Sequence, residues 1–332
     1  MIISEQKILI LISFTLSIFI LSCSSNSINE DIVYSANKNG NIDIYKITLK
    51  DFEVTRLTTN EGIDTQPRWS NNKSKIAFLS KRNSDWSLYI MDKDGESEKP
   101  LISKMGDIED YSWCPKSEKI AVQINDGISR WISIVNVEDE QINHLTQKSE
   151  NATLGGWSPD GEWLLFSIEG DIDNPGIRKK NPAGVDEVMV TSGKDSNANW
   201  SPDGKWIAFN RLTEDGSNDL YLHNINENQS QNIAPDDYDE NFLTWSKESK
   251  LLFTSVKEGN TEIYKFDPKN NNETRLTNNR VEDNYPVWND SGKLILFRSM
   301  NDGDYDLYYM EKSGENQQRI TNTSYEIVDA DW

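Results

Sequence analysis

A tryptophan recurs at a nearly constant interval along the chain, and this ladder constrains the fold more than any other feature. Successive members lie 43 to 45 residues apart, and seven of the eleven tryptophans belong to it: Trp69, Trp113, Trp157, Trp200, Trp245, Trp288 and Trp332. Such a period indicates repeats in which each unit buries its apolar face only against its neighbours. The ladder predicts the fold but not the function, because one repeat fold hosts many unrelated activities.

Each repeat contains four short runs of apolar or alternating residues, which indicate strands. In the clearest copy a Ser-Pro-Asp-Gly turn at 201–204 follows Trp200, and an Ile-Ala-Phe triplet at 207–209 comes next. Proline fixes φ, aspartate bonds its own backbone and glycine accepts a positive φ, so this segment is a turn between two strands. Four strands in about 44 residues is the period of a propeller blade.

The two ends of the repeat region complement each other. The first unit begins with Ile-Val-Tyr at 32–34 and has no tryptophan before it, whereas residues 326–332 form a spare innermost strand. We expect this C-terminal strand to complete the blade begun by residues 31–58, which closes the ring and removes two exposed sheet edges. The prediction is an all-β fold over residues 31–332, a seven-bladed β-propeller of four-stranded antiparallel blades in which each ladder tryptophan fills the wedge between two blades.

The repeat pattern resembles a known family. Trp-Ser-Pro-Asp-Gly-Lys, Ile-Ala-Phe, Asp-Ile-Tyr and Arg-Leu-Thr together resemble the WD-like repeats of the TolB family over residues 31–332, and the turns at 158–161 and 201–204 match best. TolB itself has a six-bladed propeller and a separate N-terminal α/β domain, and this chain departs from both features. By analogy, the resemblance implies a protein that binds partner proteins.

The N-terminal segment predicts export. Residues 1–22 hold Lys7 and an apolar run at 8–21, which is short for a transmembrane span and suits a signal peptide. The sequence Ile-Leu-Ser-Cys ending at Cys23 resembles a bacterial lipobox; the alternative is a plain signal peptide with a chance cysteine. Lipidation of Cys23 implies a membrane anchor, with residues 23–30 as a flexible tether. Ser24 favours the outer membrane by the sorting rule known for such lipoproteins, facing the periplasm or the cell surface.

Charge narrows the choice of partners. The chain has 55 acidic and 34 basic residues, a net charge of −21. This field repels phosphate, so we expect no nucleic-acid binding. We expect a monomer that binds a protein partner.

Acidic residues recur three to five positions before the ladder tryptophans, where the chain enters each innermost strand. They are Asp64, Glu109, Asp110, Asp195, Glu240, Asp283 and Asp329. We expect them to form an acidic ring around the mouth of the central channel, which would focus a negative potential. Such a ring suits a basic segment of a partner or a Ca²⁺ ion. The alternative is that each carboxylate caps its own loop by accepting backbone N–H bonds.

The sequence offers little support for catalysis. A peptidase of the prolyl-oligopeptidase type needs a Gly-x-Ser-x-Gly elbow and a later histidine, and the chain has neither that elbow nor the length for the second domain. Oligogalacturonate lyases use similar repeats with a histidine-rich metal site, but His144 and His223 are the only histidines here. We therefore expect a binding or scaffolding module without a cofactor; the alternative is a carbohydrate-active or other lyase or hydrolase with its site in the channel.

Overall fold

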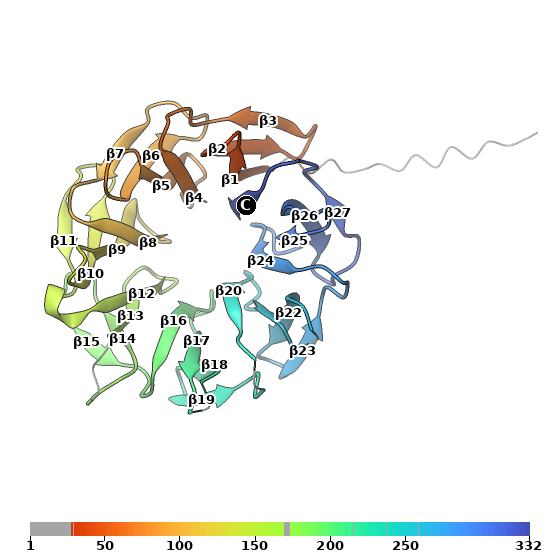
Figure 1. The fold of residues 1–332 in the computed structure, drawn as a ribbon. Coiled ribbons are helices and arrows are strands. Elements are labelled where there is room, and N and C mark those ends of the chain that lie inside the picture. Colours follow the sequence, from red (N-terminus) through yellow and green to blue (C-terminus); the bar gives the residue numbers. More distant parts are fainter. Residues whose placement is uncertain (1–27, 29, 169–172, 215, 237, 258) are drawn as a thin grey trace, which may run out of the picture.

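Seven four-stranded antiparallel sheets surround a central channel (Figure 1). The computed structural model describes residues 28, 30–168, 173–214, 216–236, 238–257 and 259–332. The leader and Cys23 lie outside these residues. In the described part the one helical element is a 3₁₀ turn, η1 (Lys148–Glu150), and no helix there has the length and hydropathy needed to cross a bilayer.

Each sheet is one blade, and its innermost strand faces the channel. Blade 1 contains β28 (Ile327–Asp331), β1 (Asp31–Lys38), β2 (Asn41–Thr48) and β3 (Glu53–Arg56). Blade 2 contains β4 (Ile63–Trp69), β5 (Lys75–Lys81), β6 (Ser87–Asp92) and β7 (Lys99–Ile102). Blade 3 contains β8 (Asp107–Trp113), β9 (Lys119–Asn125), β10 (Arg130–Asn136) and β11 (Ile142–His144). Blade 4 contains β12 (Ala152–Trp157), β13 (Leu164–Ile168), β14 (Ile177–Lys180) and β15 (Glu187–Met189).

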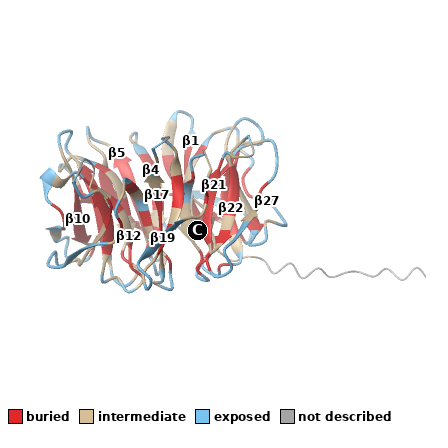
Figure 2. Cartoon of the chain, turned by 90° about the horizontal axis from the view of Figure 1, so that it is seen from below, coloured by how far each residue is buried: buried red, intermediate tan, exposed pale blue. Residues whose placement is uncertain are grey.

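The last three blades follow the same order. Blade 5 contains β16 (Asp195–Trp200), β17 (Trp206–Leu212), β18 (Asn218–Asn224) and β19 (Gln229–Asn232). Blade 6 contains β20 (Asn241–Trp245), β21 (Leu251–Ser255), β22 (Glu262–Asp267) and β23 (Asn272–Arg275). Blade 7 contains β24 (Asp283–Trp288), β25 (Leu294–Ser299), β26 (Asp306–Glu311) and β27 (Gln318–Arg319). Figure 2 shows the blades from the side, with buried strands at mid-height and exposed loops on both faces.

The predicted closure of the ring is confirmed. β28 pairs antiparallel with β1, in the register Val33 with Asp331 and Ser35 with Asp329, so the C-terminal strand is the innermost strand of blade 1. The same strand also bonds to blade 2: the Asp331 carboxylate accepts the Trp69 backbone N–H at 2.8 Å. Closure therefore joins three blades: blade 7, from which the strand continues along the chain, blade 1, with which it pairs, and blade 2, to which it bonds.

Two turns that follow ladder tryptophans share one geometry although the sequence of the second has drifted. In the turn at 158–161 the Ser158 hydroxyl accepts the Trp163 N–H at 2.9 Å, and Gly161 has φ +75°. In the divergent turn at 70–73 the Ser70 hydroxyl accepts the Lys75 N–H at 3.0 Å, and Lys73 takes the left-handed position at φ +54°. The hydroxyl and the left-handed residue thus define this turn, as expected for serine and glycine turn chemistry.

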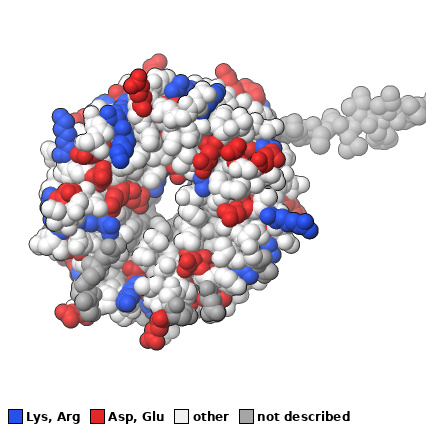
Figure 3. Space-filling view, in the orientation of Figure 1, with Lys and Arg blue, Asp and Glu red and all other residues white. Residues whose placement is uncertain are grey.

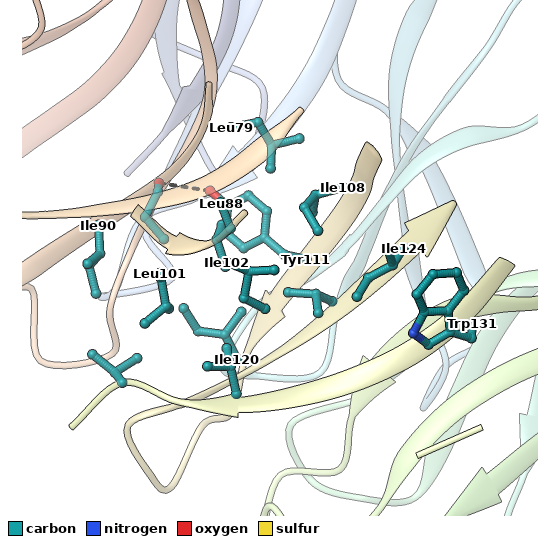
Figure 4. Close-up of a cluster of buried hydrophobic side chains, with 14 residues drawn as sticks. Leu79, Leu88, Ile90, Leu101, Ile102, Ile108, Tyr111, Ile120, Ile124 and Trp131 are labelled. Atoms are coloured by element: carbon teal, nitrogen blue, oxygen red, sulfur yellow. Dashed lines mark hydrogen bonds between the residues drawn. The ribbon is translucent and has the colours of Figure 1, made fainter. Parts of the chain in front are cut away.

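The hydrophobic core is divided among the seven interfaces between blades. Each interface has its own cluster of buried side chains drawn from the two adjoining sheets. Figure 4 shows the cluster between blades 2 and 3, in which Tyr111 is fully buried and its hydroxyl donates to the Ala77 carbonyl at 2.8 Å. No cluster lies within a single blade, so a blade has no core of its own.

Every interface also contains one ladder tryptophan, as the wedge prediction requires. Trp332 packs in the cluster between blades 7 and 1, and the other six occupy the corresponding clusters around the ring. Some of these indoles also bond across the interface: Trp157 Nε1 donates to the Ser112 carbonyl at 3.1 Å. The ladder is therefore a set of inter-blade contacts.

Replacing Trp332 with alanine should lower the free energy of unfolding by about 3–5 kcal/mol, the usual cost of removing a buried aromatic side chain. Trp332 is 4 % exposed and belongs to the interface that closes the ring. Urea unfolding followed by circular dichroism measures the loss. The matched control is Trp163→Ala, because Trp163 is half-buried and off the ladder. An equal loss in both variants would show that the closing interface has no special weight.

Candidate functional site

The central channel is the main cavity of the ring, with a volume of about 710 Å³, a size typical of ligand pockets. Figure 3 shows it open through the middle of the disc, with acidic and basic side chains interspersed around it. All seven innermost strands line it, together with one residue of β17. The polar and aromatic lining side chains are Gln66, Arg68, Glu109, Asp110, Ser112, Asn197, Asn199, Asn210, Asn241, Phe242, Thr244, Tyr285, Asp329 and Asp331.

The seven predicted site residues occupy different positions of the repeat. Counted back from the ladder tryptophan, the fifth residue (the −5 position) and the third residue (the −3 position) behave differently. The −5 residues are Asp64, Ile108, Ala152, Asp195, Glu240, Asp283 and Ile327. The −3 residues are Gln66, Asp110, Leu154, Asn197, Phe242, Tyr285 and Asp329. Of these two positions, only −3 lines the channel; the remaining predicted residue, Glu109, lies at −4 and also lines it.

The four carboxylates at −5 are buried, so they do not form the exposed ring that we expected. Asp64, Glu240 and Asp283 are 0 % exposed, and Asp195 is 6 % exposed. A buried carboxylate needs compensating partners, and neighbouring strands supply them in two of these blades. Arg82 contacts Asp64 at 3.0 Å and Arg211 contacts Asp195 at 2.6 Å. These carboxylates hold the ends of strands together within a blade.

Among the described residues, no arginine forms an ion pair with Asp283 or Glu240. The Asn279 side chain donates to Asp283 at 2.6 Å, yet desolvation still raises the pKa of Asp283 to about 6. For Glu240, no described group lies in good hydrogen-bonding geometry with either carboxylate oxygen. Desolvation is the main cause that raises the pKa of Glu240 to about 8, and repulsion from Asp236 is the second. The Ser255 hydroxyl and the Leu220 N–H face the carboxylate and favour its charged form, but their effect is smaller.

The other three blades with a carboxylate at −5 have a hydrogen-bond donor that blade 6 lacks. Four residues before the −5 carboxylate, the chain places a donor in three blades, namely Asn60, Thr191 and Asn279; each donates to that carboxylate. In blade 6 the corresponding residue is Asp236, which repels Glu240 instead. Asp219 also faces Glu240, but its oxygens already accept from Ser217 and Asn232. Glu240 is therefore a buried acid that the fold holds in its neutral form.

The other three predicted residues do line the channel, on blades 1 and 3. Asp110 and Asp329 occupy the −3 position, and Glu109 stands next to Asp110. Arg68 contacts Asp110 at 2.8 Å, and the Asp329 carboxylate accepts from the Thr65 hydroxyl at 2.7 Å. The structure thus groups three of the seven carboxylates on one arc, with the blade 2 arginine between them.

Glu109 is the most heavily bonded of the three. Its oxygens accept from Asn125 at 2.6 Å, from Gln123 at 2.7 Å and from Arg130 at 2.8 Å. Burial opposes ionisation here, but these hydrogen bonds outweigh it and hold the pKa of Glu109 below its usual range. This geometry differs from the capping alternative, because the donors to Glu109 are side chains and not backbone N–H groups.

Sequence reasoning missed the opposite arc of the channel, on blades 5 to 7. It presents amides and two aromatic rings, from Asn197, Asn199, Asn210, Asn241, Phe242 and Tyr285. The sequence does contain a signal for which positions line the channel. The exact distance of each residue from its tryptophan separates the buried −5 position from the channel-lining −3 position. The predicted acidic ring groups the positions from −5 to −3 together.

The backbone also divides the blades into two groups. A one-residue register shift bends each innermost strand before its tryptophan, as a β-bulge does. In the four blades with a carboxylate at −5, the −3 residue is left-handed, with φ +50° to +54° at Gln66, Asn197, Phe242 and Tyr285. The other three blades have Asp110, Leu154 and Asp329 at −3 without a positive φ.

Neither histidine lies in the channel lining. His144 is on β11 and His223 is on β18, and each bonds a serine hydroxyl of a neighbouring strand, Ser133 at 2.9 Å and Ser230 at 3.0 Å. Within the described part of the chain, no three His, Cys, Asp or Glu residues are grouped so that they could hold a metal ion.

Glu240 makes stability depend on pH. The folded state keeps its proton up to about pH 8, whereas the unfolded chain loses it near pH 4 to 5. Between these values the folded state binds more protons, so the free energy of unfolding should fall as pH rises and then level off above pH 8. Glu240→Gln should remove this contribution and raise stability at pH 8.5 by on the order of a few kcal/mol. Urea midpoints at pH 5.5, 7 and 8.5 measure it.

The matched control is Asp195→Asn, at the same repeat position. It removes the ionic partner of Arg211, and a buried cation without its partner is costly. This variant should therefore lose stability at pH 7, the opposite sign to Glu240→Gln. Equal effects from both substitutions would contradict the distinction between the two blades.

Known proteins resemble this chain in sequence and in fold. The Tol-Pal system protein TolB of Francisella tularensis subsp. mediasiatica is 28% identical over 167 residues, which are 49% of this chain and 38% of that protein. The matched segment thus spans well under half of the curated relative. The crystal structure of TolB from Acinetobacter baumannii superposes with a TM-score of 0.59 at 18% identity, over 87% of this chain and 78% of that one.

A lyase has a similar fold. Oligogalacturonate lyase from Vibrio parahaemolyticus superposes with a TM-score of 0.62 at 13% identity, over 87% of this chain and 84% of that one. At this identity the likeness shows the fold alone. The family comparison is more extensive, since the model described as "TolB beta propeller domain" matches residues 26–171 and 183–332. With its ring of seven blades and its repeat, the chain belongs to the TolB β-propeller domain family.

Proposed function

We propose that this chain is a non-catalytic binding module of the bacterial envelope, tethered through a lipid on Cys23, whose channel-mouth face docks a protein partner. The family match over most of the chain carries this proposal. The curated relatives are named as proteins of the Tol-Pal system, so a role among partner proteins is the function that the family supports best. The lyase alternative rests on fold likeness, and the channel has no histidine in its lining.

The face for docking is the one where the innermost strands begin. Asp110 and Asp329 line the channel from the middle of β8 and β28, where a segment entering from this face would meet them, and the Asp110 side chain is 44 % exposed. The net charge of −21 favours approach of a basic partner segment. Such steering acts over about a Debye length, so it should fade as salt rises.

The anchor is tested by Cys23→Ser. If Cys23 is lipidated, this variant should stay unprocessed at residue 23 and should lose its acyl label, because serine offers no thiol for the lipid. Metabolic labelling with a fatty acid and fractionation of envelopes provide the measurement, and the wild-type chain is the control. Unchanged labelling and unchanged membrane fractionation of the variant would exclude the lipid anchor and leave the plain signal peptide.

The docking face is tested by the double variant Asp110→Asn and Asp329→Asn. Crosslinking in intact envelopes should capture less of the partner than wild type does, and the difference should shrink between 10 mM and 150 mM salt, where the Debye length falls from about 30 Å to about 8 Å. The control is Asp290→Asn, a 62 % exposed carboxylate in the turn at the far end of β24. Equal capture by all three proteins at low salt would rule out this face.

A further inference from the structure

Two aromatic rings form part of the channel wall in blades 6 and 7. The centroids of Phe242 and Tyr285 lie 3.7 Å apart, and Phe242 is 39 % exposed. The Arg298 guanidinium lies 3.9 Å from the Tyr285 centroid, so Tyr285 has a neighbour on each face. Arg298 is itself fixed, because it is 7 % exposed and donates to the Ile327 carbonyl at 3.1 Å. The outer ring, Phe242, is therefore supported from behind and open to the channel.

Packing alone does not account for an aromatic residue at this position. Phe242 and Tyr285 both have left-handed backbones, at φ +54° and +51°, a conformation that non-glycine residues seldom adopt. At the same position blade 5 has Asn197, a residue type that tolerates this conformation. A large apolar side chain that is strained and partly exposed to the channel offers an accessible stacking surface.

Amides surround this surface. Asn197, Asn199 and Asn210 of blade 5 and Asn241 of blade 6 line the same cavity. An amide offers both donors and an acceptor, so the group suits a ligand that carries hydroxyls. Gly155 and Gly156 of the adjoining blade 4 also line the cavity, and a Cβ at Gly156 would lie 2.7 Å from the Asn199 side-chain oxygen, so glycine there leaves room for that amide.

The charged arc across the channel disfavours an anionic ligand. Its side chains also already bond to other side chains of the protein. The Arg68 guanidinium contacts Asp110, the Thr65 hydroxyl bonds Asp329, and three side chains bond Glu109. The excess of carboxylates over Arg68 in the lining repels uronic acids and phosphates.

The neutral arc is engaged only in part. Asn197 donates to the Asn210 side-chain oxygen at 3.2 Å and Asn199 donates to the Asn197 carbonyl at 3.3 Å. Among the described residues, the side-chain oxygens of Asn197 and Asn199, the Asn241 amide and the aromatic face of Phe242 are left to bind a ligand in the channel.

We propose that the channel binds a neutral saccharide, with one sugar ring stacked on Phe242 and its hydroxyls bonded by Asn199, Asn241 and Asn197. Sugar rings present an apolar C–H face and a rim of hydroxyls, which these two kinds of side chain match. The cavity of about 710 Å³ has room for a short oligosaccharide. This site is separate from the docking of a protein partner, and it involves binding without chemistry.

The test is calorimetric titration of the wild-type protein with four neutral trisaccharides: maltotriose, cellotriose, xylotriose and chitotriose. A trimer of galacturonic acid and a trilysine peptide serve as charged comparators. At least one neutral trisaccharide should bind with a dissociation constant of about 1 mM or lower. Its affinity should change little between low and high salt, because the contacts are uncharged. Heat from the galacturonic acid or the lysine trimer alone would overturn the proposal.

Phe242→Asn provides the decisive variant. It gives blade 6 the residue that blade 5 already has, so its melting temperature should stay level or rise as the strain is relieved. Its affinity for the bound trisaccharide should fall roughly tenfold. Asn241→Ala, at an exposed position, should also weaken binding.

The control is Phe52→Asn. Phe52 has φ +60° and is 49 % exposed, but it lies in the turn between β2 and β3, away from the channel lining. This variant should bind as wild type does. Absence of binding by all four neutral trisaccharides at concentrations up to about 10 mM, or equal binding by the Phe242 and Phe52 variants, refutes the proposal. Neither result bears on crosslinking of a protein partner at the channel mouth.

Discussion

A ring of radially arranged sheets is narrow at the channel and wide at the rim, and the space between neighbouring sheets must be filled for the ring to hold. Here one tryptophan fills part of each wedge, within a cluster that draws on both adjoining blades. Because no blade has a core of its own, the stability of each blade depends on its two neighbours. The innermost strands that form the channel wall end at or next to these tryptophans, so the same contacts position the wall.

The sequence predicted those parts of the fold that depend on short motifs, because each motif recurs in blade after blade. The tryptophan period, the turn signal and the missing first strand together predicted seven blades and the closure by β28, and the structure confirms them. The acidic positions were harder, because burial of a carboxylate depends on partners from other strands. The residues around Asp64 in the sequence do not indicate that Arg82 forms an ion pair with it. The residues around Glu240 likewise do not indicate that its carboxylate has no arginine partner among the described residues.

The channel shows how one backbone position can carry different chemistry around a ring. The −3 position holds Asp329 and Asp110 on one arc, and Phe242 and Tyr285 on the other. The repeat places this position in the channel lining in every blade, while the backbone conformation and the side chain vary from blade to blade. Blades 1 to 3 therefore form a charged arc and blades 5 to 7 a neutral one, so that a partner protein and a neutral ligand would contact different walls of the same channel.

The pairing of β1 with β28 has a consequence for how the ring assembles. Other blades form from strands that follow one another along the chain, so their loops are short, and local contacts form quickly. The closing contacts are of another kind: Ser35 bonds Asp329 across 294 residues. The entropic cost of closing a loop grows only with the logarithm of its length. The long intervening chain therefore adds little to the cost of this contact once the intervening blades have formed. Until β28 pairs with β1, the inner edge of β1 and the facing sides of blades 1 and 7 remain uncovered, so this one strand protects the ring against pairing with other chains.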